Sequence, residues 1–272
     1  MDRQPGQYLG HPTTVLLEDN KTLLCVDPEG HGKGPIRLRR SPDGGIVAMA
    51  SVVPVRSKPG HYFAFFHDDG RFIRAHREVT LPVTFTVYSS ESNDGGITWG
   101  QPRPLVSRSD IHLCEPGVIR SPDGRELAML LRENSRRRNS WLMTSRDEGC
   151  TWSEPRELPA ALTGDRHVAR YTRDGRPFVA FRDMARESAT KGDWVAWVGR
   201  YRDIVHGKEG QCRVRLMDNH HAFDCAYPAV EILPDDTLVT TTYGHWERGE
   251  PPFIVSVRLR LHELDQRLQL GR

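Results

Sequence analysis

An eight-residue pattern that occurs twice constrains the fold of this chain more than any other feature. Residues 92–99 read SNDGGITW and residues 145–152 read SRDEGCTW, so both fit Ser-x-Asp-x-Gly-x-Thr-Trp. In such a segment the Asp side chain can bond the backbone of a tight turn, the Gly can take a positive φ, and the Trp can cover the hairpin. The repeat therefore predicts an outer β-hairpin that recurs in a repeated sheet unit.

A third copy of this Asp-box pattern is broken. It starts at Ser41 but runs directly into the apolar residues Ile46–Ala48 instead of reaching Thr and Trp. From Ser92 and Ser145 to the next hairpin turn there are 30 and 28 residues, whereas from Ser41 to the turn at Lys58 there are 17. The first unit therefore lacks room for an outer fourth strand, and we count five units rather than six.

Five segments follow the order apolar strand, tight polar turn, apolar strand, which is typical of β-hairpins. A third apolar strand follows each hairpin, and no stretch shows sustained helical periodicity. The expected strand pairs are 13–17 with 22–26, 52–55 with 62–66, 117–119 with 127–131, 167–171 with 178–181, and 229–233 with 237–241. The expected third strands are 36–40, 85–89, 140–144, 194–201 and 253–261.

The spacing of these hairpins sets the fold class. Their turns begin 40 to 64 residues apart, near or above the length of one propeller blade. We therefore expect an all-β fold, a β-propeller with four-stranded blades and about five recognisable blades, forming a single domain over residues 1–272. A plain β-sandwich is the alternative.

Composition excludes several function classes. The 38 basic and 36 acidic residues leave a net charge of +2, which gives no electrostatic case for nucleic acid or for a membrane as a partner. Five Cys without close spacing argue against a disulfide framework and against a zinc knuckle. The first residues are not a signal peptide, so we expect a cytoplasmic protein, or a secreted or periplasmic one if a leader was trimmed.

With its two Asp-boxes and its repeated apolar hairpins, the chain resembles the sialidase (neuraminidase) superfamily from about His11 to Leu264. Sialidases are normally six-bladed, hold the substrate carboxylate with three Arg residues, and use a Tyr nucleophile that a Glu polarises. A neutral phenol suits this chemistry because the carboxylate on the anomeric carbon would repel an anionic nucleophile. The resemblance implies a glycosidase that acts on a terminal, sialic-acid-like acidic sugar.

The resemblance also implies roles for particular residues. Glu115, followed 17 residues later by Arg132, matches the middle motif of the family, so Glu115 would activate the Tyr and Arg132 would clamp the carboxylate. Tyr227 stands just before the last hairpin, where the family has its nucleophile. Arg182 is the candidate for a third clamp, and Arg186 is the second choice. The alternatives are a solvated loop Glu, surface or salt-bridged Arg residues, and a buried structural Tyr.

The first hairpin departs from the family pattern. Gly10-His11-Pro12 stands where the family has its first clamp Arg. His11 is a weaker, pH-dependent substitute, and Arg37 or Arg39 could also reach the substrate. The acid/base residue is expected in the Gly-rich loop 27–35, at Asp27, Glu29 or His31.

Further polar residues stand at strand ends, where a propeller binds ligands. The substrate-binding candidates of this kind are His67, Asp68, Arg71, His167 and His245. His220 and His221 are adjacent and would point to opposite faces of a strand, so we expect no metal site and no cofactor.

Three functions remain open. The first is a sialidase-like glycosidase, and the second is a hydrolase or lyase for another acidic sugar on the same scaffold. The third is a non-catalytic glycan-binding propeller, which the abbreviated first unit favours. An acidic sugar or glycan is the expected partner in each case. A ring that does not close would expose strand edges, so we also expect a homo-oligomer.

Overall fold

The computed structural model describes residues 13–16, 23–26, 51–68 and 84–270. The chain divides into two compact units, which are considered separately here. Unit 1 comprises residues 1–36, 164–203 and 209–272, and unit 2 comprises residues 37–163 and 204–208. Within the described residues all sheets are antiparallel, and their strands lie side by side in chain order or its reverse. A single propeller domain over residues 1–272 stays a prediction.

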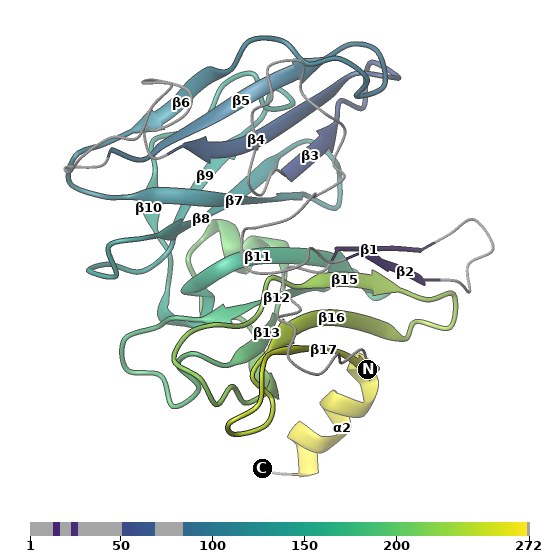
Figure 1. Ribbon diagram of the computed structural model, residues 1–272. Coiled ribbons are helices and arrows are strands. Elements are labelled where there is room, and N and C mark those ends of the chain that lie inside the picture. The colour runs from purple at the N-terminus through teal and green to yellow at the C-terminus, as the bar shows by residue number, and fades with distance from the viewer. Residues whose placement is uncertain (1–12, 17–22, 27–50, 69–83, 271–272) are drawn as a thin grey trace. The chain divides into compact units, whose positions relative to one another are not determined.

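Unit 2 contains two four-stranded sheets, drawn in blue and teal in Figure 1. The first sheet has the order β3-β4-β5-β6, and the second has the order β7-β8-β9-β10. The expected hairpins at 52–66 and 117–131 and the third strands near 85 and 140 are thereby confirmed. The strands are β3 (Ser51–Pro54), β4 (Tyr62–Asp68), β5 (Thr86–Ser92), β6 (Arg103–Ser107), β7 (Leu113–Arg120), β8 (Leu127–Glu133), β9 (Trp141–Ser145) and β10 (Arg156–Glu157).

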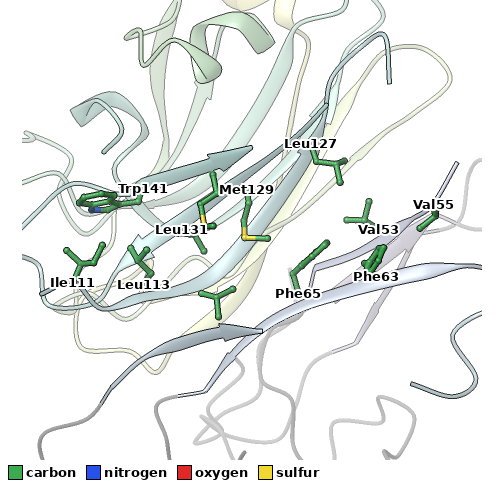
Figure 2. Packing of buried hydrophobic residues seen from close by; sticks show 12 residues of the cluster. Val53, Val55, Phe63, Phe65, Ile111, Leu113, Leu127, Met129, Leu131 and Trp141 are labelled. Atoms are coloured by element: carbon green, nitrogen blue, oxygen red, sulfur yellow. The ribbon is translucent and has the colours of Figure 1, made fainter. Parts of the chain in front are cut away.

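The core of unit 2 lies between these two sheets, as Figure 2 shows. Successive side chains of a strand point to opposite faces, so residues two apart share a face. Phe63 and Phe65 of β4 enter the core, as do Met129 and Leu131 of β8, and all four side chains are buried. Ala64 and Phe66, which lie on the opposite face of β4, are also buried, so this strand is covered on both faces.

The first Asp-box is the turn between β5 and β6. Asp94 accepts hydrogen bonds from the backbone nitrogens of Ile97 at 3.1 Å and Thr98 at 2.9 Å. It also accepts one from the Thr98 hydroxyl at 2.6 Å. The bonds from Thr98 lower the pKa of Asp94 from 3.8 to about 2. Gly95 and Gly96 have φ values of 79° and 83°, which a turn of this kind requires.

The second Asp-box, between β9 and β10, repeats this network and adds a contact to the neighbouring sheet. Asp147 accepts bonds from the Thr151 nitrogen at 2.9 Å and the Thr151 hydroxyl at 2.5 Å. The Trp152 indole donates to the Gly149 carbonyl at 3.0 Å. The Trp152 ring also meets Phe65 of β4 edge-on, with ring centroids 5.3 Å apart. Both boxes are therefore outer hairpins, as the sequence predicted.

Unit 1 contains a four-stranded sheet in the order β11-β12-β13-β14, a three-stranded sheet in the order β15-β16-β17, and the hairpin β1-β2. These elements confirm the remaining three predicted hairpins, and Figure 1 shows β15 to β17 in yellow-green. The strands are β1 (Thr13–Leu16), β2 (Leu23–Val26), β11 (Gly164–Tyr171), β12 (Pro177–Asp183), β13 (Trp194–Val198), β14 (Cys212–Met217), β15 (Ala229–Ile232), β16 (Leu238–Gly244) and β17 (Phe253–Leu259).

Short helices correct two of the predicted strand ends. The strand expected over 194–201 ends at Val198, and α1 (Tyr201–Val205) begins after it. The strand expected over 253–261 ends at Leu259, and α2 (Leu261–Leu270) follows, although no helix was predicted. Leu261 is buried and Leu264 packs beside it on the core of unit 1, so tertiary contact stabilises α2. A 3-10 turn, η1, covers Ala160–Leu162. Among the described residues no helix has the length and apolar character of a membrane span.

Candidate functional site

In the sheets β7–β10 and β11–β14, the first two strands shift register within their pairing. A residue with positive φ also stands just before β15, the first strand of the sheet β15–β17. β7 and β8 lose register between Cys114 and Gly117, and β11 and β12 lose it between Asp165 and Val168. Bulges of this kind aim side chains toward functional sites. A non-glycine residue with positive φ occupies each place: Glu115 at 49°, Arg166 at 57° and, just before β15, Ala226 at 54°. Such strain is concentrated at functional sites, so these three places are candidate site positions.

The first of these places holds an ion pair in unit 2. Glu115 is 3% exposed, and its Oε1 lies 2.5 Å from Nη1 of Arg132 on β8. The backbone nitrogen of Glu115 donates to Nδ1 of His67 at 3.2 Å, so the His67 ring accepts at Nδ1. His67 and the buried Asp68 both lie on β4. The structure thus brings together three of the predicted site residues, Glu115, Arg132 and His67.

The second place, in unit 1, holds a buried pair that anchors the segment before β15. Arg182 of β12 is 6% exposed, and Asp165 of β11 is fully buried. The Arg182 Nε donates to Asp165 Oδ2 at 2.9 Å, and Nη2 donates to the same oxygen. Nη1 donates to the carbonyl oxygens of Phe223 and Cys225, the latter at 3.1 Å. Arg182 therefore fixes the backbone that leads to Tyr227.

Electrostatics holds Arg182 in its charged form. Burial alone would lower the pKa of the guanidinium, but the carboxylate of Asp165 outweighs it, and the pKa is raised above its usual value. Burial also raises the pKa of the neighbouring Cys225 thiol, which therefore stays neutral. A positive charge, paired with Asp165 and hydrogen-bonded to two backbone carbonyls, is thus held in a buried position.

Tyr227 is in contact with this charge and with a second aromatic ring. The Arg182 guanidinium carbon is 5.7 Å from the centroid of the half-buried Tyr227 ring. The Tyr243 ring stacks on the Tyr227 ring, with a centroid distance of 6.2 Å and an angle of 22° between the ring planes. The Tyr243 hydroxyl donates to Asp224 Oδ1 at 3.0 Å, and Asp224 Oδ2 lies 3.2 Å from His245 Nε2. A connected set of polar and aromatic groups, the Tyr227 site, therefore surrounds the predicted nucleophile.

Other predicted residues take separate positions. His167, next to the strained Arg166, is buried against the Phe181 ring at a centroid distance of 4.9 Å. Arg186 is exposed in the loop that follows β12. The predicted residues that lie outside the described ones are His11, Asp27, Glu29, His31, Arg37, Arg39 and Arg71.

Sequence reasoning gave no role to Asp165 or Asp224, and it weighed His221 only to argue against a metal site. It allowed a salt bridge as the alternative role of Arg182 but did not identify the partner, which is Asp165. A signal was present: Glu115 stands 17 residues before Arg132, and Asp165 stands 17 residues before Arg182. An acid and an Arg at this spacing meet across the open end of a hairpin.

Comparison with known families gives one match over most of the chain. Residues 2–239 match the model of a family described as a BNR repeat-like domain. This match confirms the resemblance to Asp-box propellers that the sequence indicated. No curated protein matches the chain.

Solved structures with a similar fold include a protein of unknown function from Dyadobacter fermentans. It is 17% identical with a TM-score of 0.61, and the match covers 77% of this chain and 52% of that one. An endo-arabinase from Bacteroides thetaiotaomicron is 13% identical with a TM-score of 0.53 over 94% of this chain and 96% of that one. An exo-β-1,3-galactanase from Phanerochaete chrysosporium is 13% identical with a TM-score of 0.52, over 80% of this chain and 49% of that one.

These structures establish the fold. The chain spans about half the length of the Dyadobacter chain and of the galactanase. It is an all-β protein whose antiparallel sheets are the blades of a β-propeller of sialidase type.

Proposed function

The chain belongs to the family of BNR repeat-like domains, and from this premise we propose that it is a glycoside hydrolase. Its substrate is a glycan with a terminal acidic sugar of the sialic acid type, and Tyr227 is the nucleophile.

The observation that carries the proposal is the setting of Tyr227. Its ring is half-buried beside a guanidinium that Asp165 keeps charged and in place. A fixed cation near a phenol stabilises the negative charge that develops on the oxygen as it attacks. A phenol beside a fixed cation also tolerates a carboxylate on the substrate, whereas a carboxylate nucleophile would be repelled.

The proposed reaction has two steps. The Tyr227 oxygen attacks the anomeric carbon and gives its proton to the polarising carboxylate, while the glycosidic bond breaks and an acid residue protonates the leaving oxygen. Water, which gives a proton to the now deprotonated acid residue, then displaces the phenol oxygen from the glycosyl–tyrosine, and the phenol takes its proton back from the carboxylate as the free sugar leaves. The exposed Arg186, in the same unit as Tyr227, is proposed as a carboxylate clamp. The resemblance to sialidases implies the remaining roles: Glu115 would polarise the phenol, Arg132 would clamp the carboxylate, and Asp27, Glu29 or His31 would be the acid.

Arg182 receives a different role in this proposal. Four hydrogen bonds join its three nitrogens to Asp165, Phe223 and Cys225. We therefore assign it to positioning Tyr227 rather than to gripping the substrate from solvent.

A neutral sugar is the second candidate substrate. The endo-arabinase match covers nearly the whole of both chains, which favours this alternative on overall architecture. A neutral sugar has no carboxylate for the positive charges near Tyr227 to bind, so we place this substrate second.

The test is a panel of fluorogenic glycosides: an α-sialoside, a β-glucuronide, an α-L-arabinofuranoside and a β-galactoside. Each is incubated with the parent protein, with Tyr227→Phe and with the matched variant Tyr62→Phe. Tyr62 is a half-buried tyrosine on β4 of unit 2 and has no proposed role. We expect release from an acidic glycoside by the parent and by Tyr62→Phe. Loss of the nucleophile should lower kcat/KM by about 1,000-fold or more in Tyr227→Phe.

Each other outcome has a defined meaning. Turnover by Tyr227→Phe at the parent rate contradicts the nucleophile, and release from neutral glycosides alone contradicts the acidic substrate. An unsaturated product that absorbs in the near ultraviolet identifies a lyase. Saturable glycan binding without any product identifies a binding module and overturns the hydrolase.

A further inference from the structure

Three side chains with metal-binding atoms meet beside the end of β16. His221 and Asp224 come from the segment between β14 and β15, and His245 follows β16 directly. One potential ligand atom from each lies within 4.8 Å of the other two. A hollow of about 240 Å³ adjoins the two histidines and leaves room for solvent ligands. The hollow is lined by His220, His221, His245, Glu247, Gly249, Glu250 and Pro251.

The contacts of His245 fix which of its nitrogens faces the cluster. Its Nδ1 lies 3.2 Å from the carbonyl oxygen of Glu250. A carbonyl only accepts, so Nδ1 carries a hydrogen and the neutral ring has its lone pair on Nε2. That Nε2 lies 3.2 Å from Asp224 Oδ2, which is also an acceptor. A neutral His245 therefore turns a lone pair toward this carboxylate oxygen, and either a proton on Nε2 or a bound cation completes the contact.

The surroundings match those of a metal site. Metal-bound histidines usually donate their second ring N–H to a backbone carbonyl, as His245 does to Glu250. Ligating carboxylates are usually held by a further hydrogen bond, as the Tyr243 hydroxyl holds Asp224 at 3.0 Å. The His221 ring lies 4.4 Å from the His245 ring and brings a second imidazole to the same point.

We propose that His221, Asp224 and His245 bind a divalent transition-metal ion of the Zn²⁺ class. Two imidazole nitrogens and one carboxylate suit zinc, iron or cobalt, whereas calcium and magnesium prefer oxygen ligands. The remaining coordination positions face the hollow and are filled by water. This assignment departs from the expectation, drawn from the sequence, that the chain binds no metal, and it does not depend on the proposed glycosidase.

The ion would tie the segment that leads to Tyr227 to the end of β16. Asp224 stands three residues before Tyr227, and Cys225 forms an isolated bridge with Gly244, next to His245. A bound ion therefore adds a second anchor to the one that Arg182 supplies through the Phe223 and Cys225 carbonyls.

The experiment measures metal binding directly. Untagged protein is stripped with chelator and titrated with Zn²⁺, with Ca²⁺ and with Co²⁺. The visible absorption of bound Co²⁺ reports nitrogen and oxygen ligation. The variants are His221→Ala and His245→Ala, with His220→Ala as the matched control. His221 is exposed, so its replacement leaves the fold intact, and His220 lines the same hollow without belonging to the cluster.

We expect one equivalent of Zn²⁺ in the parent and in His220→Ala, with a higher melting temperature for the zinc-bound form. Affinity should fall at least about 100-fold in His221→Ala, because even the outer partners of metal ligands contribute 10- to 100-fold. No stoichiometric binding by the parent, or equal affinity in His221→Ala, overturns the site. Binding of Ca²⁺ in preference to Zn²⁺ overturns the metal class. Loss of zinc in His221→Ala is readable whether or not any glycoside is cleaved.

Discussion

Glu148 allows a prediction in which glycine should be a better replacement than alanine. It occupies the place in the second Asp-box that Gly95 occupies in the first, and its φ is 64° against 79° for Gly95. A left-handed residue other than glycine costs about 1–2 kcal/mol. Glu148 offsets this strain by binding Arg120, with contacts of 2.9 Å and 2.8 Å, and by accepting from the Arg56 nitrogen at 3.3 Å.

The two replacements separate the ion pair from the strain. Both Glu148→Ala and Glu148→Gly lose the partly buried pair with Arg120, a loss of about 1–2 kcal/mol. Alanine keeps the strained backbone, whereas glycine relieves it and gives back about 0.4–1 kcal/mol through its freer unfolded chain. Glu148→Gly should therefore be more stable than Glu148→Ala by about 0.5–1 kcal/mol, which is a difference of about 1–4 °C in Tm.

Urea and thermal unfolding, followed by circular dichroism, measure this order. Gly95→Ala tests the same backbone from the other side and should lose about 0.5–1 kcal/mol, because no atom lies within 4 Å of the added carbon. Arg146, 86% exposed in the same box, should show the ordinary order, with alanine above glycine. If Glu148→Gly is less stable than Glu148→Ala, the strain argument is wrong.

Three further predictions concern burial and charge. Arg182→Met leaves the carboxylate of Asp165 buried without its cation and should destabilise the protein by about 3–5 kcal/mol in urea unfolding, and a loss below about 1 kcal/mol would contradict this. Burial raises the pKa of Asp174 but hydrogen bonds from Arg176 and Thr172 outweigh it, so the folded-state pKa is about 2, below the ordinary 3.8. The stabilisation by Asp174 is therefore full above about pH 4 and is lost as the pH falls toward 2. In Asp174→Ala the free energy of unfolding should depend less on pH in that window. Parallel curves of this free energy against pH for the parent and the variant would refute the assignment. Met129→Ala opens a cavity in the core of unit 2 and should cost about 2–5 kcal/mol, measured as a lower urea midpoint with an unchanged slope.

Local signals explain how much of the fold the sequence predicted. The Asp-box networks lie within seven residues of chain, so both turns follow from sequence alone. The alternation in β4 places Phe63 and Phe65 on one face without reference to the rest of the molecule. Helix α2 was missed because its stability comes from contacts of Leu261 and Leu264 with distant strands.

The site was predicted less completely because its geometry depends on pairing between strands. Glu115 and Arg132 were found through the family resemblance, and the equivalent pair of Asp165 and Arg182 was not, although its spacing is the same. The cluster around His245 joins segments that are 21 and 24 residues apart in sequence. Its residues were individually visible, but a local pattern does not bring them together.

The contact between the second Asp-box and Phe65 limits how this chain can be divided or recombined. A carbon added at Gly149 would come within 3.0 Å of the Phe65 ring, and Trp152 meets the same ring edge-on. The turn that closes the sheet β7–β10 is therefore seated on a side chain of the sheet before it. A duplication, a deletion or a graft cut at the blade boundary would separate the two halves of this joint. A fragment that keeps this contact must therefore include both the second Asp-box and strand β4 of the preceding sheet.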